Sequence, residues 1–260
     1  MPLFDKKAKR LRDRPSLLFP ADPGGAVVDL LRRYDPDLSV SPDRLALGNG
    51  VRLYGPIEVT PGIEQKASLP PGMTTAYYTV VAFGAEAKGR PEKAMWQDAE
   101  RLVRALAARL GGTVHDKQPP MRQKLEATVY CARPLPPEQV IDVLQPFVDT
   151  GKLFVDTSPD EPERYNLTTE ERPPFFVMYW PPQLGLSTLK QTPLALAGRF
   201  GNDPCSWGLY GFDEVANTPA EVIVKVGEAA LALARAADGI VIDGYGFPID
   251  RPGELLPASS

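Results

Sequence analysis

Few residues in this chain of 260 could carry out chemistry by themselves. Histidine occurs once, as His115, and the two cysteines, Cys131 and Cys205, lie far apart in the sequence. A thiolate nucleophile needs a neighbouring base, so His115 and Cys131 are one conceivable pair. We favour a simpler interpretation, in which His115 is a polar residue at the end of a strand and Cys131 is a small buried side chain. A zinc site needs three or four ligands at characteristic spacings, so we predict no metal and no cofactor.

Carboxylates are the remaining candidates for catalysis, because a glycosidase-like pair needs only proximity in space. The candidates lie close to aromatic residues that would suit a sugar ring. They are Trp207, Tyr210, Asp213, Glu214, Asp243 and Asp250. The competing interpretation is that residues 208–212 form a loop that packs over the core. We therefore name no catalytic residue, and keep a carboxylate-dependent enzyme acting on a small molecule or sugar as an alternative hypothesis.

A second acidic group suggests a docking surface. Residues 156–172 contain six carboxylates and two arginines. The candidate contact residues are Asp156, Asp160, Glu161, Glu163, Tyr165, Glu170 and Glu171. Complementary charge steers two proteins together, so these residues would suit a protein partner with a basic surface. The competing interpretation is a solvated loop with no partner.

Charge is distributed unevenly along the chain. Residues 1–14 hold six lysines and arginines against two aspartates, although the whole chain carries a net charge of −4. An acidic body lacks the basic face of a nucleic-acid-binding domain, so we expect no nucleic-acid contact except through this basic arm. No stretch approaches the roughly 20 apolar residues that cross a bilayer, and the N-terminal residues lack a secretory pattern. We expect a cytoplasmic protein without a transmembrane segment.

Hydrophobic periodicity and glycine positions predict the main elements. The expected helices are 26–34, 93–110, 137–147 and 218–237, the last being apolar on nearly every face and deeply buried. The expected strands are 16–20, 76–83, 125–131, 175–180 and 240–243. A hairpin is expected around Gly48-Asn49-Gly50, because glycine and asparagine accept positive φ. Residues 181–217 are expected to be irregular.

The two halves of the chain end alike, because residues 109–116 and 236–243 both combine a helix end, a glycine, β-branched residues and an aspartate. This order predicts an α+β fold of two tandem split-βαβ (ferredoxin-like) halves in a pseudo-symmetric arrangement. The expected divisions are a basic flexible arm (1–15), a first half (16–118), a second half (125–250) and a tail (251–260). Such an internal duplication would place Val80 and Val177 on equivalent strands.

Two short segments resemble known families. Residues 102–118, which end in the run LGGTVHDKQ, resemble the last helix and strand of the C-terminal domain of ZipA, the FtsZ-binding split-βαβ module. Residues 237–248, with the run ADGIVIDGYGFP, are similar to the ending of bacterial α+β families that include immunity-like proteins of polymorphic toxin systems. No site residue carries over from either resemblance.

The resemblances imply a binding role. Our leading hypothesis is a non-catalytic protein-binding protein, either immunity-like and toxin-neutralising or a scaffold or chaperone. A ZipA-like cell-division adaptor is a further alternative.

Overall fold

The structure is a computed structural model. It describes residues 3–87, 89–116, 124–147, 154–158, 161–168, 175–180, 193–196, 199–200, 205–214 and 219–255. The chain divides into two compact units, unit 1 within Met1–Pro120 and unit 2 within Met121–Leu256. Both are mixed α+β, and each is built on one antiparallel sheet. The described residues contain six α-helices in total.

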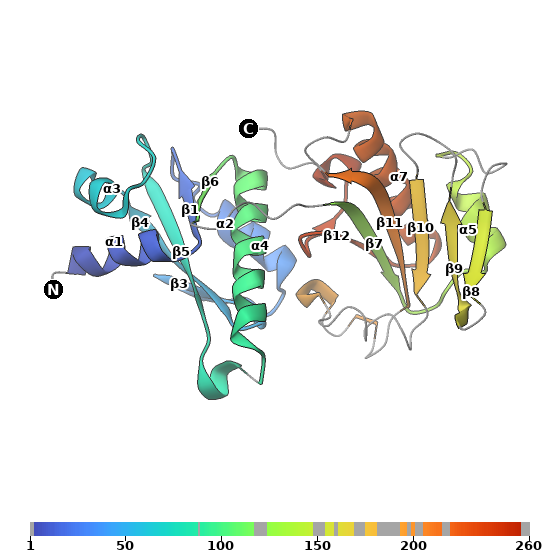
Figure 1. Cartoon of the computed structure of the whole chain (residues 1–260), viewed down its shortest axis with the longest axis horizontal. Coiled ribbons are helices and arrows are strands. Elements are labelled where there is room, and N and C mark those ends of the chain that lie inside the picture. Colours follow the sequence, from blue (N-terminus) through green and yellow to red (C-terminus); the bar gives the residue numbers. More distant parts are fainter. Residues whose placement is uncertain are drawn as a thin grey trace. The chain divides into compact units, whose positions relative to one another are not determined.

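Unit 1 contains a six-stranded sheet in the order β2-β3-β4-β5-β1-β6 (Figure 1). Its strands are β1 (Ser16–Phe19), β2 (Ser39–Ser41), β3 (Arg44–Ala46), β4 (Val51–Glu58), β5 (Thr75–Val81) and β6 (Thr113–His115). Its helices are α1 (Leu3–Asp13), α2 (Ala26–Tyr34), α3 (Pro61–Ala67) and α4 (Glu92–Leu110), with a 3₁₀ turn η1 (Gly84–Ala87).

Both faces of this sheet are covered. Leu17 and Leu18 are neighbours in the inner strand β1 and therefore point to opposite faces, yet neither is exposed. The helix α4 packs against β1, β4 and β5, and it ends where Gly111 takes the left-handed conformation at φ 67°. On the opposite face, Leu18 packs in one cluster with residues of α1 and α3. The unit consequently has a sheet between two helical layers.

The first 15 residues differ from the expected flexible arm. Residues 3–13 form α1, which packs against α3, and its Ala8 and Leu11 are 2% and 0% exposed. The sequence suggested a tail because lysine and arginine dominate the segment, but two apolar residues three positions apart on one helical face are enough to anchor it. The lysines and arginines are therefore held on an ordered helix.

Unit 2 contains a seven-stranded sheet in the order β13-β12-β7-β11-β10-β9-β8 (Figure 1). Its strands are β7 (Lys124–Cys131), β8 (Phe154–Ser158), β9 (Glu161–Thr168), β10 (Phe175–Trp180), β11 (Cys205–Glu214), β12 (Ile240–Asp243) and β13 (Pro248–Ile249). Its helices are α5 (Pro137–Leu144) and α7 (Ala220–Ala236), with 3₁₀ turns η3 (Leu194–Leu196) and η5 (Pro252–Leu255).

The core of unit 2 lies between the sheet and the two helices. Val129, Trp207 and Leu209 from the central strands pack in one buried cluster with Val226 and Leu233 of α7. This helix is less uniformly buried than its composition suggested, because its Glu221, Glu228 and Arg235 are exposed.

Two expectations for unit 2 are wrong. Residues 205–214 were expected to be irregular, but they form β11, which pairs with β7 and β10 near the centre of the sheet. Residues 251–255 were expected to belong to a tail, but η5 packs against α7 and its Leu255 is 7% exposed. The close approach of the η5 backbone to Gly227 ties this segment to the core of the unit.

Candidate functional site

The acidic candidates for partner binding lie mainly on one hairpin at the edge of the unit 2 sheet. Asp156 is on β8, whereas Glu161, Glu163 and Tyr165 are on β9. The register places Asp156 opposite Asn166, and Thr157 opposite Tyr165. The segment expected as a loop is therefore largely two paired strands. Three of the candidates, Asp160, Glu170 and Glu171, lie outside the described residues.

The outer side of β8 is the part of this hairpin that could receive a partner. β8 is last in the strand order, and no strand among the described residues pairs with it except β9. An edge strand presents backbone N–H and C=O groups that another chain can pair with. The hairpin thus combines backbone hydrogen-bonding groups with acidic residues.

The alternative carboxylate site is not assembled as the sequence suggested. Trp207 is 0% exposed and packs in the core, with its ring 5.5 Å from that of Tyr179, so it is no platform for a sugar. In the sheet register Asp243 lies opposite Ala127, whereas Glu214 lies opposite Lys124 on the other side of β7. The two carboxylate-bearing residues are therefore not neighbours. Asp213 also lies near the end of β11, and the structure describes only the backbone at Asp213 and Glu214.

Asp243 has a structural role at the end of β12. Its Oδ1 accepts hydrogen bonds from the backbone N–H groups of Tyr245 and Phe247, at 3.0 and 2.8 Å. The residue is 7% exposed. An aspartate that closes a turn in this way satisfies backbone donors next to the buried Phe247. The aspartate at the end of the 236–243 motif therefore stabilises the turn that follows β12, which explains why this position holds an aspartate.

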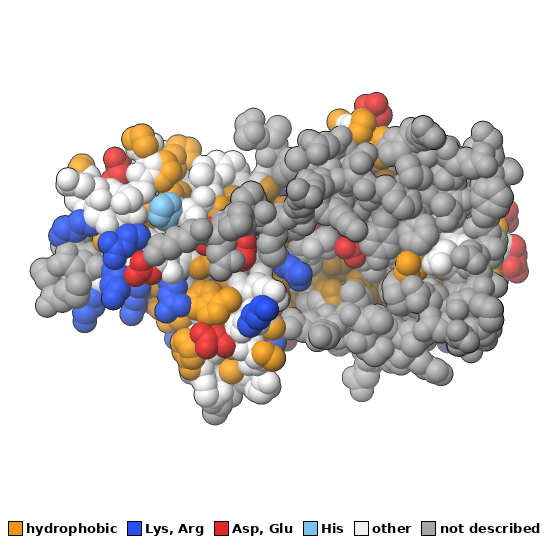
Figure 2. All heavy atoms as spheres, in the orientation of Figure 1, with side chains coloured by type: hydrophobic (Ala, Val, Ile, Leu, Met, Phe, Trp, Pro, Cys, Tyr) orange, Lys and Arg blue, Asp and Glu red, His pale blue; other side chains and the backbone are white. Residues whose placement is uncertain are grey.

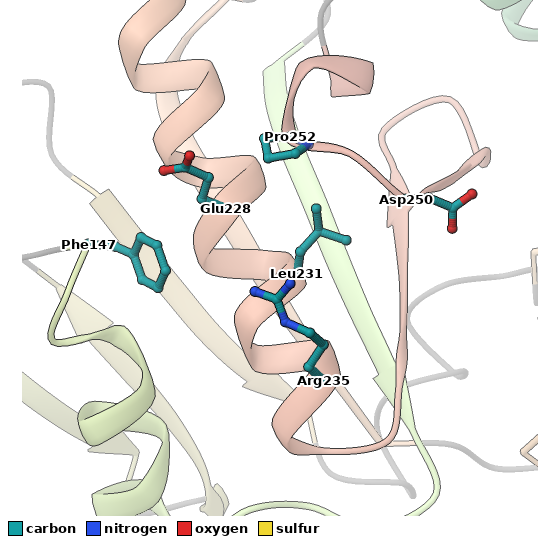
Figure 3. A pocket seen from close by; sticks show the side chains of 6 residues that line it. All are labelled: Phe147, Glu228, Leu231, Arg235, Asp250 and Pro252. Carbon is teal, nitrogen blue, oxygen red and sulfur yellow. The ribbon is translucent and has the colours of Figure 1, made fainter.

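A hollow of about 380 Å³ lies on the outer side of α7 (Figure 3). It is lined by Phe147, Glu228, Leu231, Arg235, Asp250 and Pro252. In Figure 3 the Glu228 side chain extends toward the side where Phe147 lies, whereas the Asp250 carboxylate points away from α7. The charged groups do not converge on one point, as a pair of catalytic carboxylates would.

The basic residues of α1 form a positive patch on unit 1. Figure 2 shows Lys and Arg side chains gathered over this helix, and Lys6, Lys9 and Arg12 are exposed. Arg10 donates a hydrogen bond of 2.6 Å to the Tyr78 hydroxyl, and its guanidinium lies 5.5 Å from that ring. Arg14 lies 4.6 Å from the ring of Trp96. Arg10 of α1 and Arg14, which follows the helix, are thus positioned by aromatic residues of the same unit.

A buried polar network around the β3–β4 hairpin was not anticipated. The Arg90 guanidinium pairs with Asp98 at 2.7 Å and also donates to the carbonyl of Asn49. Asp35, which is 2% exposed, accepts a hydrogen bond of 2.7 Å from the Gly48 N–H. Burial raises the pKa of the nearby Tyr34 hydroxyl, and the charges of Asp98 and Asp35 add to the effect. The network fixes the Gly48-Asn49-Gly50 turn against α2 and α4.

The two cysteines of the chain lie side by side in unit 2. Cys131 is the last residue of β7, Cys205 is the first of β11, and the register places them directly opposite each other. Their Sγ atoms are 3.0 Å apart, and both thiols are free and fully buried. Their separation in sequence concealed this pairing, which only the strand register reveals. His115, the other member of the conceivable dyad, belongs to unit 1, whereas Cys131 belongs to unit 2.

Within the parts of the chain that the structure describes, no three His, Cys, Asp or Glu residues gather as metal ligands would. In the same residues, no helix has both the length and the apolar character of a membrane span. No family model, no curated protein and no solved structure matches the chain.

Proposed function

We propose that the chain is a non-catalytic protein-binding protein built from two tandem split-βαβ (ferredoxin-like) copies of one unit. The duplication is supported by the strand orders. Starting from the same end, the unit 1 sheet runs β6-β1-β5-β4-β3-β2, and the unit 2 sheet runs β12-β7-β11-β10-β9-β8 after an additional edge strand, β13. In each unit the long helix, α4 or α7, connects the third strand of this order to the first. The split-βαβ plan has this connectivity.

The strand orders contradict the expected equivalence of the strands that carry Val80 and Val177. In this correspondence β5 matches β11 and β4 matches β10. Val80 lies on β5 and Val177 on β10, so they are not on corresponding strands. The mismatch arose because β11 was missed in the sequence and β10 was paired with β5 in its place.

We place the docking surface at the β8–β9 hairpin, and the observation that carries this proposal is the position of β8 at the edge of its sheet. An extended segment of a partner can add to such an edge through main-chain hydrogen bonds. Asp156, Glu161 and Glu163 supply negative charge there, and residues 121–260 as a whole contain 19 Asp and Glu against 11 Lys and Arg. A field of this sign attracts a basic partner and raises its rate of encounter.

The experiment compares three forms of the full chain. The test variant combines Asp156→Asn, Glu161→Gln and Glu163→Gln. The matched control combines Glu221→Gln, Glu228→Gln and Asp238→Asn, which removes the same charge from exposed positions on and after α7. A tagged wild-type chain captures the partner from native lysate. Association of the purified partner with each form is then measured at low and high ionic strength.

We expect the test variant to associate about tenfold more slowly at low salt and to show a weaker salt dependence. The control should behave like the wild type. The melting temperature of the control should match that of the wild type, because its exposed charges contribute only about 0–1 kcal/mol each. The melting temperature of the test variant is measured to show that it is folded. Equal association rates and equal salt dependence for the test variant and the wild type would remove the hairpin from the interface.

The identity of the captured partner distinguishes between the immunity-like role and the ZipA-like role. A toxin whose activity is blocked by the wild-type chain would support the immunity-like version, and capture of FtsZ would support the ZipA-like adaptor. A chain that captures no partner but hydrolyses a glycoside, with activity lost in Asp213→Asn, would overturn the binding role and support the carboxylate enzyme. We favour binding because two of the six residues named for that site have other roles: Trp207 packs in the core and Asp243 closes a turn.

A further inference from the structure

The facing thiols of Cys131 and Cys205 have no role in the proposed docking surface. They sit at the ends of two adjacent strands, opposite each other in the antiparallel register. Residues opposite each other in such a pair have Cα atoms about 4.5–5.5 Å apart, which lies within the range of about 4.4–6.8 Å found for disulfides. The backbone is therefore already placed for a bond between them.

The sulfur atoms need only a small displacement. They are 3.0 Å apart, so an approach of about 1 Å reaches the length of a disulfide bond. A strand end can absorb such a movement more easily than a strand interior, because fewer ladder hydrogen bonds hold it. The chain contains no other cysteine, so an intrachain bond has one possible connectivity.

We propose that Cys131 and Cys205 are a site of reversible oxidation, at which a peroxide converts the two thiols into a disulfide between β7 and β11. The Cys205 thiolate attacks one peroxide oxygen and becomes a sulfenic acid, while the leaving hydroxide takes up a proton to form water. The Cys131 sulfur then attacks the Cys205 sulfur, the S–O bond breaks, and a second water leaves. Two thiols and one hydrogen peroxide thus yield one disulfide and two waters, and a dithiol reverses the change by exchange.

The local contacts assign Cys205 as the attacking thiol. Either thiol can donate the hydrogen bond that joins them, and this contact lowers the pKa of Cys205 and, together with burial, raises the pKa of Cys131. The thiolate is the nucleophilic form, so the sulfur that ionises first reacts first and the other resolves the intermediate. Both thiols are 0% exposed, which restricts the reaction to a small oxidant that enters when the strand ends open locally.

The disulfide would close a loop that contains α5, β8, β9 and β10. Oxidation would therefore constrain the segment that carries the proposed docking hairpin. The inference itself does not depend on the docking proposal, since it concerns only the two sulfur atoms.

The test uses the reduced full-length chain freed of reductant. The protein is treated with hydrogen peroxide under native conditions and then denatured in the presence of N-ethylmaleimide, which labels free thiols. The mass of the intact protein is measured by mass spectrometry. We expect a form that has lost two hydrogen atoms and takes up no label, whereas untreated protein takes up two labels. Dithiothreitol added before denaturation should restore both labels, and peptide mapping should recover the Cys131 and Cys205 peptides cross-linked.

Single substitutions supply the control. In Cys131→Ser the remaining thiol has no partner, so peroxide should add oxygen to Cys205 rather than remove hydrogen, and Cys205→Ser should behave likewise at Cys131. The proposal is overturned if wild-type protein keeps both labels, gains oxygen on each cysteine independently, or forms only disulfides between chains. Should a serine variant fail to fold, the mass and the peptide map of the wild type decide the question alone.

Discussion

Gly227 provides the sharpest test of how unit 2 is packed. It lies within α7, where replacing glycine by alanine normally stabilises a helix by about 1 kcal/mol. A Cβ atom at this position, however, would lie 2.7 Å from the carbonyl oxygen and 2.8 Å from the Cα of Pro252. Ordinary contacts of a Cβ fall at 3.4–4 Å, and the atoms in conflict belong to the backbone, so no side-chain rotation relieves the clash.

The expected magnitude follows from two opposing terms. Overpacking of a tight contact costs about 1–3 kcal/mol, and displacement of the η5 backbone places this case toward the upper end. After the helix-propensity gain is subtracted, Gly227→Ala should lower the free energy of unfolding of unit 2 by about 1–2 kcal/mol. At roughly 4 °C per kcal/mol for a domain of this size, the melting temperature should fall by about 4–8 °C.

The assay is calorimetric melting of the full chain. Gly62→Ala is the matched control, because Gly62 lies in α3 and a Cβ there would meet nothing within 4 Å. That substitution should raise the stability of unit 1 by about 0.4–1 kcal/mol. A Gly227→Ala protein that melts above the wild type would show that η5 does not pack against α7 as described.

Two further predictions test individual polar groups. Asp243→Ala should destabilise unit 2 by about 1–3 kcal/mol in urea unfolding, because it removes the acceptor for the Tyr245 and Phe247 N–H groups. Asp243→Asn keeps an acceptor oxygen and should recover most of that loss. Equal stability of Asp243→Ala and the wild type would contradict the role of Asp243 in closing the turn. The pKa of Tyr34 is raised by burial, so the unfolded chain loses this proton at a lower pH than the folded chain, and stability should fall as pH rises above about 10. Tyr34→Phe should lose less stability than the wild type between about pH 8 and about pH 11 in urea unfolding, and equal losses would contradict this assignment.

The elements with strong local patterns could be predicted from the sequence. The helix that ends at Gly111 and the turn at Gly48-Asn49-Gly50 are where glycine and asparagine indicated them. These features depend on residues close together in the chain, so local chemistry determines them. The helix α3 has an equally local start, since the Thr60 hydroxyl accepts from the Ile63 N–H before Pro61, but its seven residues are too short to show a periodic pattern.

The strand β11 could not be predicted in this way. Gly208 and Gly211 interrupt it, and glycine weakens the sequence pattern of a strand because it has no side chain to pack. The position between β7 and β10 stabilises the segment instead, through pairing on both sides. The same pairing brings Cys131 and Cys205 together, and it commits Trp207 to the core. Missing one central strand therefore concealed the pairing of the two cysteines and led to Trp207 being considered as a sugar platform.

The outer strands of the two sheets explain why we place docking in unit 2. β2 and β8 occupy the same position in their strand orders, but β2 has three residues, Ser39–Ser41, and none is charged. β8 has five residues, includes Asp156, and pairs with the eight-residue β9 that carries Glu161 and Glu163. A longer edge offers more backbone hydrogen-bonding groups, and its charge hinders pairing with another acidic edge while attracting a basic segment. The two sheets thus differ at this edge, and under the proposed docking role the difference would give the second unit a function that the first lacks.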